Sequence, residues 1–227
     1  MTETLPRPDT AFFPPLRDEH VRVIDQDVLV GRIYTEGGSH PTNWDSFRYF
    51  GPTGARVDHQ PLGRSPHSRR VHPSRGISYV APALVDARGE VMPALKTCLV
   101  ECCRDVGVIE LRRDDPFFAL FSVTRPVRLL DLADSGWLGS ARGNAAISSG
   151  RRSRAREWAR AVYSTYDGLD GVIYTTSGLP SARSVALWER AEDAMPPSPR
   201  LRMPLRDPGL RNTIERFAGE LSLDLVP

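Results

Sequence analysis

The segment RRSRAREWARAVYSTYDGLDGVIYTTSGLPSARSVALW, residues 151–188, decides the fold class. Apolar residues recur at helical spacing over 151–166, which predicts an amphipathic helix. The stretches GVIYTT (171–176) and SVALW (184–188) are rich in β-branched and apolar residues, and turn-forming residues separate them. These features predict two strands that follow the helix closely.

The same patterns extend outward along the chain. Further strands are expected at 28–34, 76–81, 117–123 and 127–132. One helix is expected from Leu95, where Leu95, Cys98, Leu99, Cys102 and Val106 lie three and four positions apart. Another follows Asp207-Pro208, and the Gly-, Pro- and Arg-rich stretch 51–75 predicts a long loop. Because helices and strands mix without regular alternation, the expected class is α+β rather than a doubly wound sheet.

The length of 227 residues suits one domain with extensions. We expect a Pro-rich arm over 1–19, a globular body over 20–195, and a Pro-rich linker with a helix over 196–227. The extensions leave the oligomeric state open, and a homo-oligomer remains an alternative.

Composition excludes several classes of protein. Apolar residues make up 40% and charged residues 26% of the chain, which is close to globular averages and excludes wholesale disorder. No apolar run approaches the roughly 20 residues needed to cross a bilayer, and the N-terminus lacks a secretory pattern, so a cytoplasmic protein without membrane contact is expected. The net charge of +2 does not demand a nucleic-acid partner, and no direct contact with nucleic acid is expected.

The three cysteines, Cys98, Cys102 and Cys103, are too close in sequence to join distant parts of the fold. No histidine lies near them in sequence, and Cys98 and Cys102 fall on the apolar stripe of the expected helix. Buried structural thiols are therefore favoured over a metal site.

No familiar local catalytic motif is present, but four short blocks occur in a definite order. They are GARVD (54–58) in a polar loop, GISYVA (76–81) on a strand, CLVE (98–101) on a helix and DGVIYTTS (170–177) on a later strand. Over about residues 43–195 this order resembles the RES family, which is named for its Arg, Glu and Ser. Members of that family are typically toxins with an Xre-like antitoxin. The resemblance implies an ADP-ribosyltransferase-like mixed sheet core with flanking helices, and NAD+ as a substrate rather than a cofactor.

The resemblance also assigns residues by matching blocks. Arg56 takes the family arginine, Tyr79 the strand tyrosine, Glu101 the helix glutamate and Ser177 the serine, with Thr176 as the competing hydroxyl. Glu101 is expected to stabilise an oxocarbenium-like transition state, and Arg56 to hold the diphosphate through paired hydrogen bonds. Tyr79 offers a stacking surface and a hydroxyl, and Ser177 a hydrogen bond to the ribose or carboxamide.

Two further sequence features each have two interpretations. The block 143–150 is expected to cap a helix, or to line the pocket with free backbone N–H groups. A basic face is predicted by the spacing of Arg152, Arg156 and Arg160, which lie four apart. This face is expected either to be solvated or to bind an acidic patch of an antitoxin.

The resulting expectation is an NAD+ glycohydrolase or phosphorylase held inactive by an antitoxin. The alternatives are an ADP-ribosyltransferase that acts on a macromolecule and a catalytically silent binding module. The sequence does not distinguish water, phosphate and a macromolecule as the acceptor.

Overall fold

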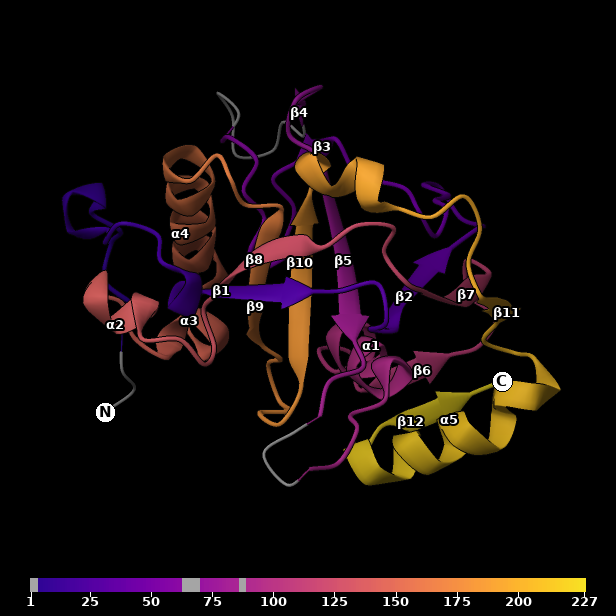
Figure 1. The fold of residues 1–227 in the computed structure, drawn as a ribbon. Coiled ribbons are helices and arrows are strands. Elements are labelled where there is room, and N and C mark those ends of the chain that lie inside the picture. Colours follow the sequence, from indigo (N-terminus) through magenta and orange to yellow (C-terminus); the bar gives the residue numbers. More distant parts are fainter. Residues whose placement is uncertain (1–3, 63–69, 86–88) are drawn as a thin grey trace.

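A twisted eight-stranded sheet forms the centre of the computed structural model, which describes residues 4–62, 70–85 and 89–227 (Figure 1). The strands in spatial order are β1 (Val21–Ile24), β8 (Val127–Asp131), β9 (Gly171–Thr175), β10 (Arg183–Trp188), β5 (Ile77–Pro82), β2 (Val30–Thr35), β7 (Pro116–Phe121) and β11 (Leu201–Pro204). Neighbouring strands are antiparallel except β8 and β9, which are parallel.

Three longer helices flank this sheet. They are α1 (Ala94–Cys103), α4 (Arg152–Thr165) and α5 (Pro208–Leu221). Shorter elements are the helices α2 (Trp137–Ser140) and α3 (Ala146–Ser149), and the 3-10 turns η1 (Thr10–Phe12), η2 (Asp18–His20) and η3 (Glu189–Ala194). Two small ladders lie outside the main sheet: β3 (Phe50–Gly51) with β4 (Arg70–Val71), and β6 (Val108–Glu110) with β12 (Asp224–Val226).

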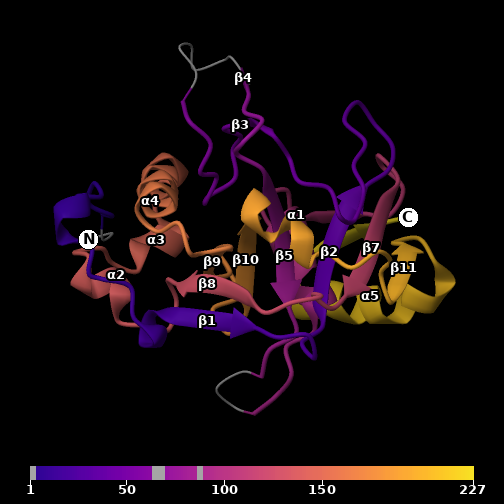
Figure 2. The ribbon, with the colours of Figure 1, turned by 45° about the horizontal axis from the view of Figure 1, so that its top comes forward.

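The alternation of side chains along the strands divides the core between the two faces of the sheet. On one face, Ala186 and Trp188 of β10 pack in a cluster with Trp158 of α4. The α1 and α5 helices share a second cluster with Ala81 and Phe118. A third cluster contains Val80 and Val185 from the opposite face, together with Ala191 of η3. In both ribbon views α4 and α5 lie toward opposite ends of the sheet (Figure 2).

The six strands and three helices expected from periodicity are confirmed, with boundaries that shift by a few residues. Val106 is a correction: α1 ends at Cys103, and the Val106 side chain is 71% exposed rather than part of the apolar stripe. The prediction that both Cys98 and Cys102 are buried is also wrong in part, because Cys98 is buried but Cys102 is exposed.

Both terminal segments contact the body. Leu5 is buried in the α4 cluster, and Trp158 donates a hydrogen bond of 2.9 Å to the Pro6 carbonyl. At the other end, β11 adds the last strand to the sheet, and Asp207 caps α5 by accepting from the Gly209 N–H. Of the Arg- and His-rich stretch expected as a long loop, residues 63–69 lie outside the described part of the chain.

Candidate active site

Strand register brings the polar residues of the site onto one face of the sheet. Ser184 of β10 lies opposite Tyr174 of β9, and Ala186, two residues further along β10, lies opposite Tyr79 of β5. Residues two apart on a strand, and directly paired residues on neighbouring strands, point to the same face. Glu101 reaches this face from the last turn of α1.

A chain of hydrogen bonds links two buried hydroxyls to the carboxylate of Glu101. The Ser184 Oγ donates to Glu101 Oε1 at 2.8 Å. A serine hydroxyl has a single hydrogen, so in the 2.8 Å contact between Thr176 Oγ1 and Ser184 Oγ it is Thr176 that donates. Both Thr176 and Ser184 are buried. The pair therefore holds Glu101 in one orientation through groups that solvent does not reach.

The charge of Glu101 is set by opposing effects. Burial of the carboxyl group raises the pKa of Glu101 above its ordinary value, while the Ser184 hydrogen bond and the nearby Arg56 guanidinium lower it. The residue keeps solvent-exposed surface, so a ligand can reach it. A partly desolvated carboxylate of this kind interacts more strongly with a developing positive charge than one in water.

Two tyrosines complete a small recess beside this carboxylate. The recess has a volume of about 60 Å³. It is lined by apolar residues and by Tyr79, Tyr174, Glu101, Ser184 and Cys102. The Tyr79 hydroxyl is buried and has no hydrogen-bond partner among the described residues. Burial raises the pKa of Tyr79 well above its ordinary value, so the hydroxyl is a protonated donor at neutral pH.

Arg56 reaches the same region from the loop that precedes β4. Its Nη1 donates to the carbonyl of Gly150 at 2.7 Å and to that of Ile147 at 3.4 Å. Burial, followed by the neighbouring Arg152, lowers the pKa of Arg56, and Glu101 opposes that shift. Arg56 and Glu101 thus lie near enough to influence each other, and no carboxylate accepts a hydrogen bond from Arg56 among the described residues.

The two competing hydroxyls occupy different positions. Thr176 belongs to the hydrogen-bonded chain, whereas Ser177 is half-buried in the turn after β9. Both line a groove of about 410 Å³ between that turn and the α2–α3 region, which also includes Asn144, Ile147 and Ser148. Because Thr176 lines the groove and bonds to Ser184, which lines the recess, the two hollows adjoin. The block 143–150 therefore lines the groove, and Asn144 also accepts a hydrogen bond from the Ala146 N–H at the start of α3.

The loop that carries Arg56 is held by buried polar groups. The Asp58 carboxylate is fully buried, and it accepts from Arg48 at 2.8 Å and from the Thr53 N–H at 2.7 Å. The buried Gln60 side chain donates to the carbonyls of Arg48 and Arg75. These bonds fix both ends of the loop that contains Arg56.

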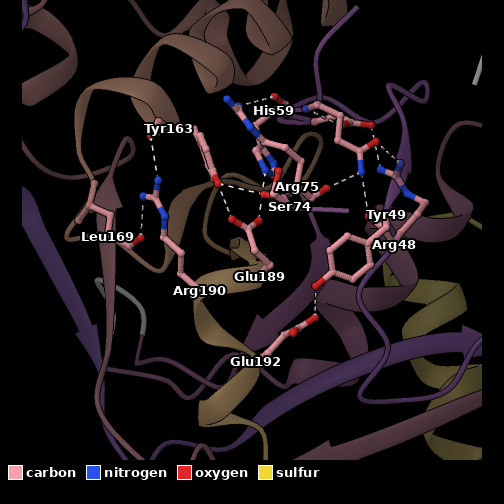
Figure 3. Close-up of polar contacts among 12 residues, drawn as sticks. Arg48, Tyr49, His59, Ser74, Arg75, Tyr163, Leu169, Glu189, Arg190 and Glu192 are labelled. Atoms are coloured by element: carbon pink, nitrogen blue, oxygen red, sulfur yellow. Dashed lines mark hydrogen bonds and ion pairs between the residues drawn. The ribbon is translucent and has the colours of Figure 1, made fainter. Parts of the chain in front are cut away.

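An aromatic contact anchors the same loop to α4. The buried imidazole of His59 stacks on Tyr163 with ring centroids 4.4 Å apart, and Glu189 lies 3.7 Å from its Nε2. Burial lowers the pKa of His59, which keeps the ring neutral at pH 7. Tyr163 in turn donates to Glu189, and Arg190 donates to backbone carbonyls nearby (Figure 3).

Ser184 and Tyr174 were not among the residues singled out from the sequence. Tyr174 lies inside the DGVIYTTS block and Ser184 begins the next strand, so both were present only as strand residues. The pairing of β9 with β10 places Tyr174 and Ser184 side by side. Their link to Glu101 follows only from the position of α1 over those strands.

The basic face on α4, expected to be solvated or to contact an acidic patch of an antitoxin, is only partly exposed. Arg152 is exposed and pairs with Asp105 just beyond α1, but Arg156 and Arg160 are half-buried. Arg160 also has a buried Nη1 without a hydrogen-bond partner among the described residues. This face is therefore only partly open to solvent.

No protein-family model matches the chain, and no curated protein sequence matches it. The fold is similar to that of a chain in the crystal structure of the M. tuberculosis MbcT-MbcA toxin-antitoxin complex. The TM-score is 0.52 at 15% sequence identity, over 86% of this chain and 92% of the matched chain. The expected α+β class, with a mixed sheet core and flanking helices, is confirmed. In the described part of the chain, no helix is long and apolar enough to cross a membrane.

Proposed function

We propose that this protein is an NAD+-degrading enzyme that cleaves the nicotinamide–ribose bond, and that it acts as a toxin restrained by an antitoxin. The observation that carries the proposal is the recess in which the buried, unpartnered Tyr79 hydroxyl faces the same small space as Glu101 and Ser184. A buried donor without a partner costs free energy in the unliganded protein, and a polar ligand would relieve that cost.

The residues suit the chemistry of this bond cleavage. When the bond breaks, its electron pair leaves with nicotinamide, and positive charge develops on the ribose ring. The Glu101 carboxylate, held by Ser184, would stabilise that charge. An acceptor oxygen would then bond to the anomeric carbon. Its proton would pass to the carboxylate of Glu101, which lines the recess.

The remaining groups suit the rest of the dinucleotide. The groove of about 410 Å³ adjoins the recess and would take one half of the ligand, with Ser177 and Thr176 at its wall. Within the part of the chain that the structure describes, Arg56 donates only to carbonyls, so its other N–H groups would donate to the diphosphate. Tyr79 would donate its hydroxyl to the ligand in the recess.

The similarity to a chain of a toxin-antitoxin complex supports the partner part of the proposal. An enzyme that destroys NAD+ would harm its own cell, and an antitoxin segment that covers the cleft beside Glu101 would prevent this. Expression of the chain alone should lower cellular NAD+ and stop growth. Untouched growth and NAD+ with folded protein at high level would exclude a toxin and favour a binding module.

The direct test is incubation of the pure protein with NAD+ and identification of the products by mass. Free ADP-ribose would indicate water as the acceptor, its phosphorylated form would indicate phosphate, and a modified macromolecule would indicate transfer.

Glu101→Gln should reduce NAD+ loss by about two to three orders of magnitude, because the amide keeps the shape but removes the charge. Glu215→Gln on the exposed face of α5 is the matched control and should keep full activity. Near-normal turnover by Glu101→Gln would contradict the assigned role.

A further inference from the structure

One face of α4 carries Arg152, Arg156, Arg160 and Tyr163, and contacts at its two ends fix its direction. At the N-terminal end Arg152 pairs with Asp105 near α1, and at the other end Tyr163 stacks on His59 of the Arg56 loop. These two contacts are about 16 Å apart along the helix. Arg156 and Arg160 lie between them on the same face. Arg156 is close enough to Tyr79 of the recess to affect its pKa, and Arg160 is close enough to be affected by Asp58 of the Arg56 loop.

The guanidinium groups at these two positions are not neutralised. Neither Arg156 nor Arg160 makes a hydrogen bond or ion pair with any residue that the structure describes, and Arg160 Nη1 is buried. The acidic groups nearby are already engaged, since Asp58 accepts from Arg48, and Glu157 pairs with Arg154. Arg56 is a third cation on the neighbouring loop, and among the described residues its hydrogen-bond partners are carbonyls.

Arg156 and Arg160 lie close enough to repel each other, and among the described residues no carboxylate accepts a hydrogen bond from either, so the buried Arg160 Nη1 is left unused. Burial lowers the pKa of Arg160, and the neighbouring Arg156 adds to that shift, while Glu157 and Asp58 oppose it. Planar guanidinium groups match phosphate oxygens through paired, charge-assisted hydrogen bonds, and half-burial strengthens such bonds. The arrangement thus has the chemistry of an anion site rather than of a solvated helix face.

We infer that Arg156 and Arg160 of α4, together with Arg56, form a subsite for phosphate groups beside the Glu101 recess. The inference deepens the proposed function and rests on it for the source of those groups. The source is either the diphosphate of the dinucleotide or free inorganic phosphate that enters as a second reactant.

The subsite is tested by calorimetric titration of inorganic pyrophosphate and inorganic phosphate into the full chain. Arg156→Gln and the double variant with Arg160→Gln should weaken binding about tenfold or more, because each removes a charge-assisted contact. Arg211→Gln, the same change of charge on exposed α5, is the matched control and should bind as the wild type does. Circular dichroism verifies that each variant is folded.

Two further arms distinguish the sources. In the Glu101→Gln background, where NAD+ is not consumed, saturating NAD+ should block phosphate binding if the diphosphate occupies the subsite. If the subsite takes free phosphate, phosphate should still bind to the NAD+-saturated protein. Nicotinamide riboside, which lacks the diphosphate, should bind equally to wild type and Arg156→Gln.

The outcomes separate the subsite from the proposed function. Arginine-dependent binding of pyrophosphate without any NAD+ turnover by the wild type would support the subsite and overturn the function. NAD+ turnover with equal affinity of wild type and double variant for both anions would overturn the subsite and leave the function standing. Failure of the wild type to bind either anion would also overturn the subsite.

Discussion

At the scale of single residues, Ser184 of β10 is the sheet residue that donates a hydrogen bond to Glu101. Its hydroxyl donates to the carboxylate at 2.8 Å and receives the hydroxyl hydrogen of Thr176. Both hydroxyls are buried, so water does not replace these bonds readily. The orientation and charge of Glu101 therefore depend on a residue more than 80 positions away in sequence.

Ser184→Ala should move the acid limb of kcat/KM for NAD+ loss to higher pH. Burial already raises the pKa of Glu101, and the Ser184 bond lowers it by favouring the ionised form. Without that bond the pKa rises further, so a given acidic pH leaves less active carboxylate. The profile is measured between pH 5 and 8, where activity should recover toward the alkaline end. Ser122→Ala, which also removes a buried hydroxyl, is the control; an unmoved limb in Ser184→Ala would show that Ser184 does not tune Glu101.

At the scale of elements, the loop between β3 and β4 positions Arg56 through buried polar bonds rather than through regular structure. Asp58 is its centre, since that fully buried carboxylate holds Arg48, Thr53 and the Gln60 N–H together. The next residue, His59, attaches the loop to α4. A loop held in this way presents Arg56 at a fixed place beside the groove.

Asp58→Asn should destabilise the protein by about 3 to 5 kcal/mol in urea denaturation, because it removes the buried carboxylate that pairs with the half-buried Arg48. It should also raise KM for NAD+, since the loop loses the bonds that hold Arg56. Asp193→Asn is the control: its carboxylate pairs with Arg125 at the surface, and its loss should change stability little. Equal effects of the two substitutions would show that the loop is held by other contacts.

At the scale of the whole molecule, the C-terminal helix is part of the packed body. Ile214 and Phe217 of α5 are buried in one cluster with Leu99 of α1, the helix that carries Glu101. In addition β11 pairs with β7 and closes that edge of the sheet. The expected division of the chain at residue 195 remains a prediction, and these contacts favour cooperative unfolding across it.

Phe217→Ala should lower the free energy of unfolding by about 3 to 5 kcal/mol, the usual cost of emptying a buried aromatic site. Val106→Ala, at an exposed position, is the control and should cost little. The four tryptophans lie outside α5, so their fluorescence follows the body while circular dichroism includes the helix. Coincident transitions are expected; an earlier loss of helix would show that residues 196–227 unfold separately.

The sequence by itself determined the local elements and the order of the blocks. Periodicity located α1, α4 and α5 and six strands of the sheet, because a buried face imposes its spacing on the nearest residues in sequence. It failed for β1, β6, β11 and β12, which are short and lie at sheet edges, where one-sided burial leaves little pattern. The blocks also gave Tyr79 and Glu101, which line one recess, and Arg56, which lies near enough to Glu101 to lower its pKa.

Only the tertiary structure decided which groups act on those residues. Ser184 is bonded to Glu101 because β10 pairs between β9 and β5 beneath α1, an order that no local pattern contains. The same packing gives the two hydroxyls of the groove different partners. Thr176 is hydrogen-bonded to Ser184, whereas Ser177 lies in the turn after β9. It also leaves Arg156 and Arg160 half-buried, whereas their spacing alone predicted a face that is solvated or that contacts an acidic patch of a partner. Spacing fixes the side of a helix on which residues lie, and only the packing of distant segments fixes what that side faces.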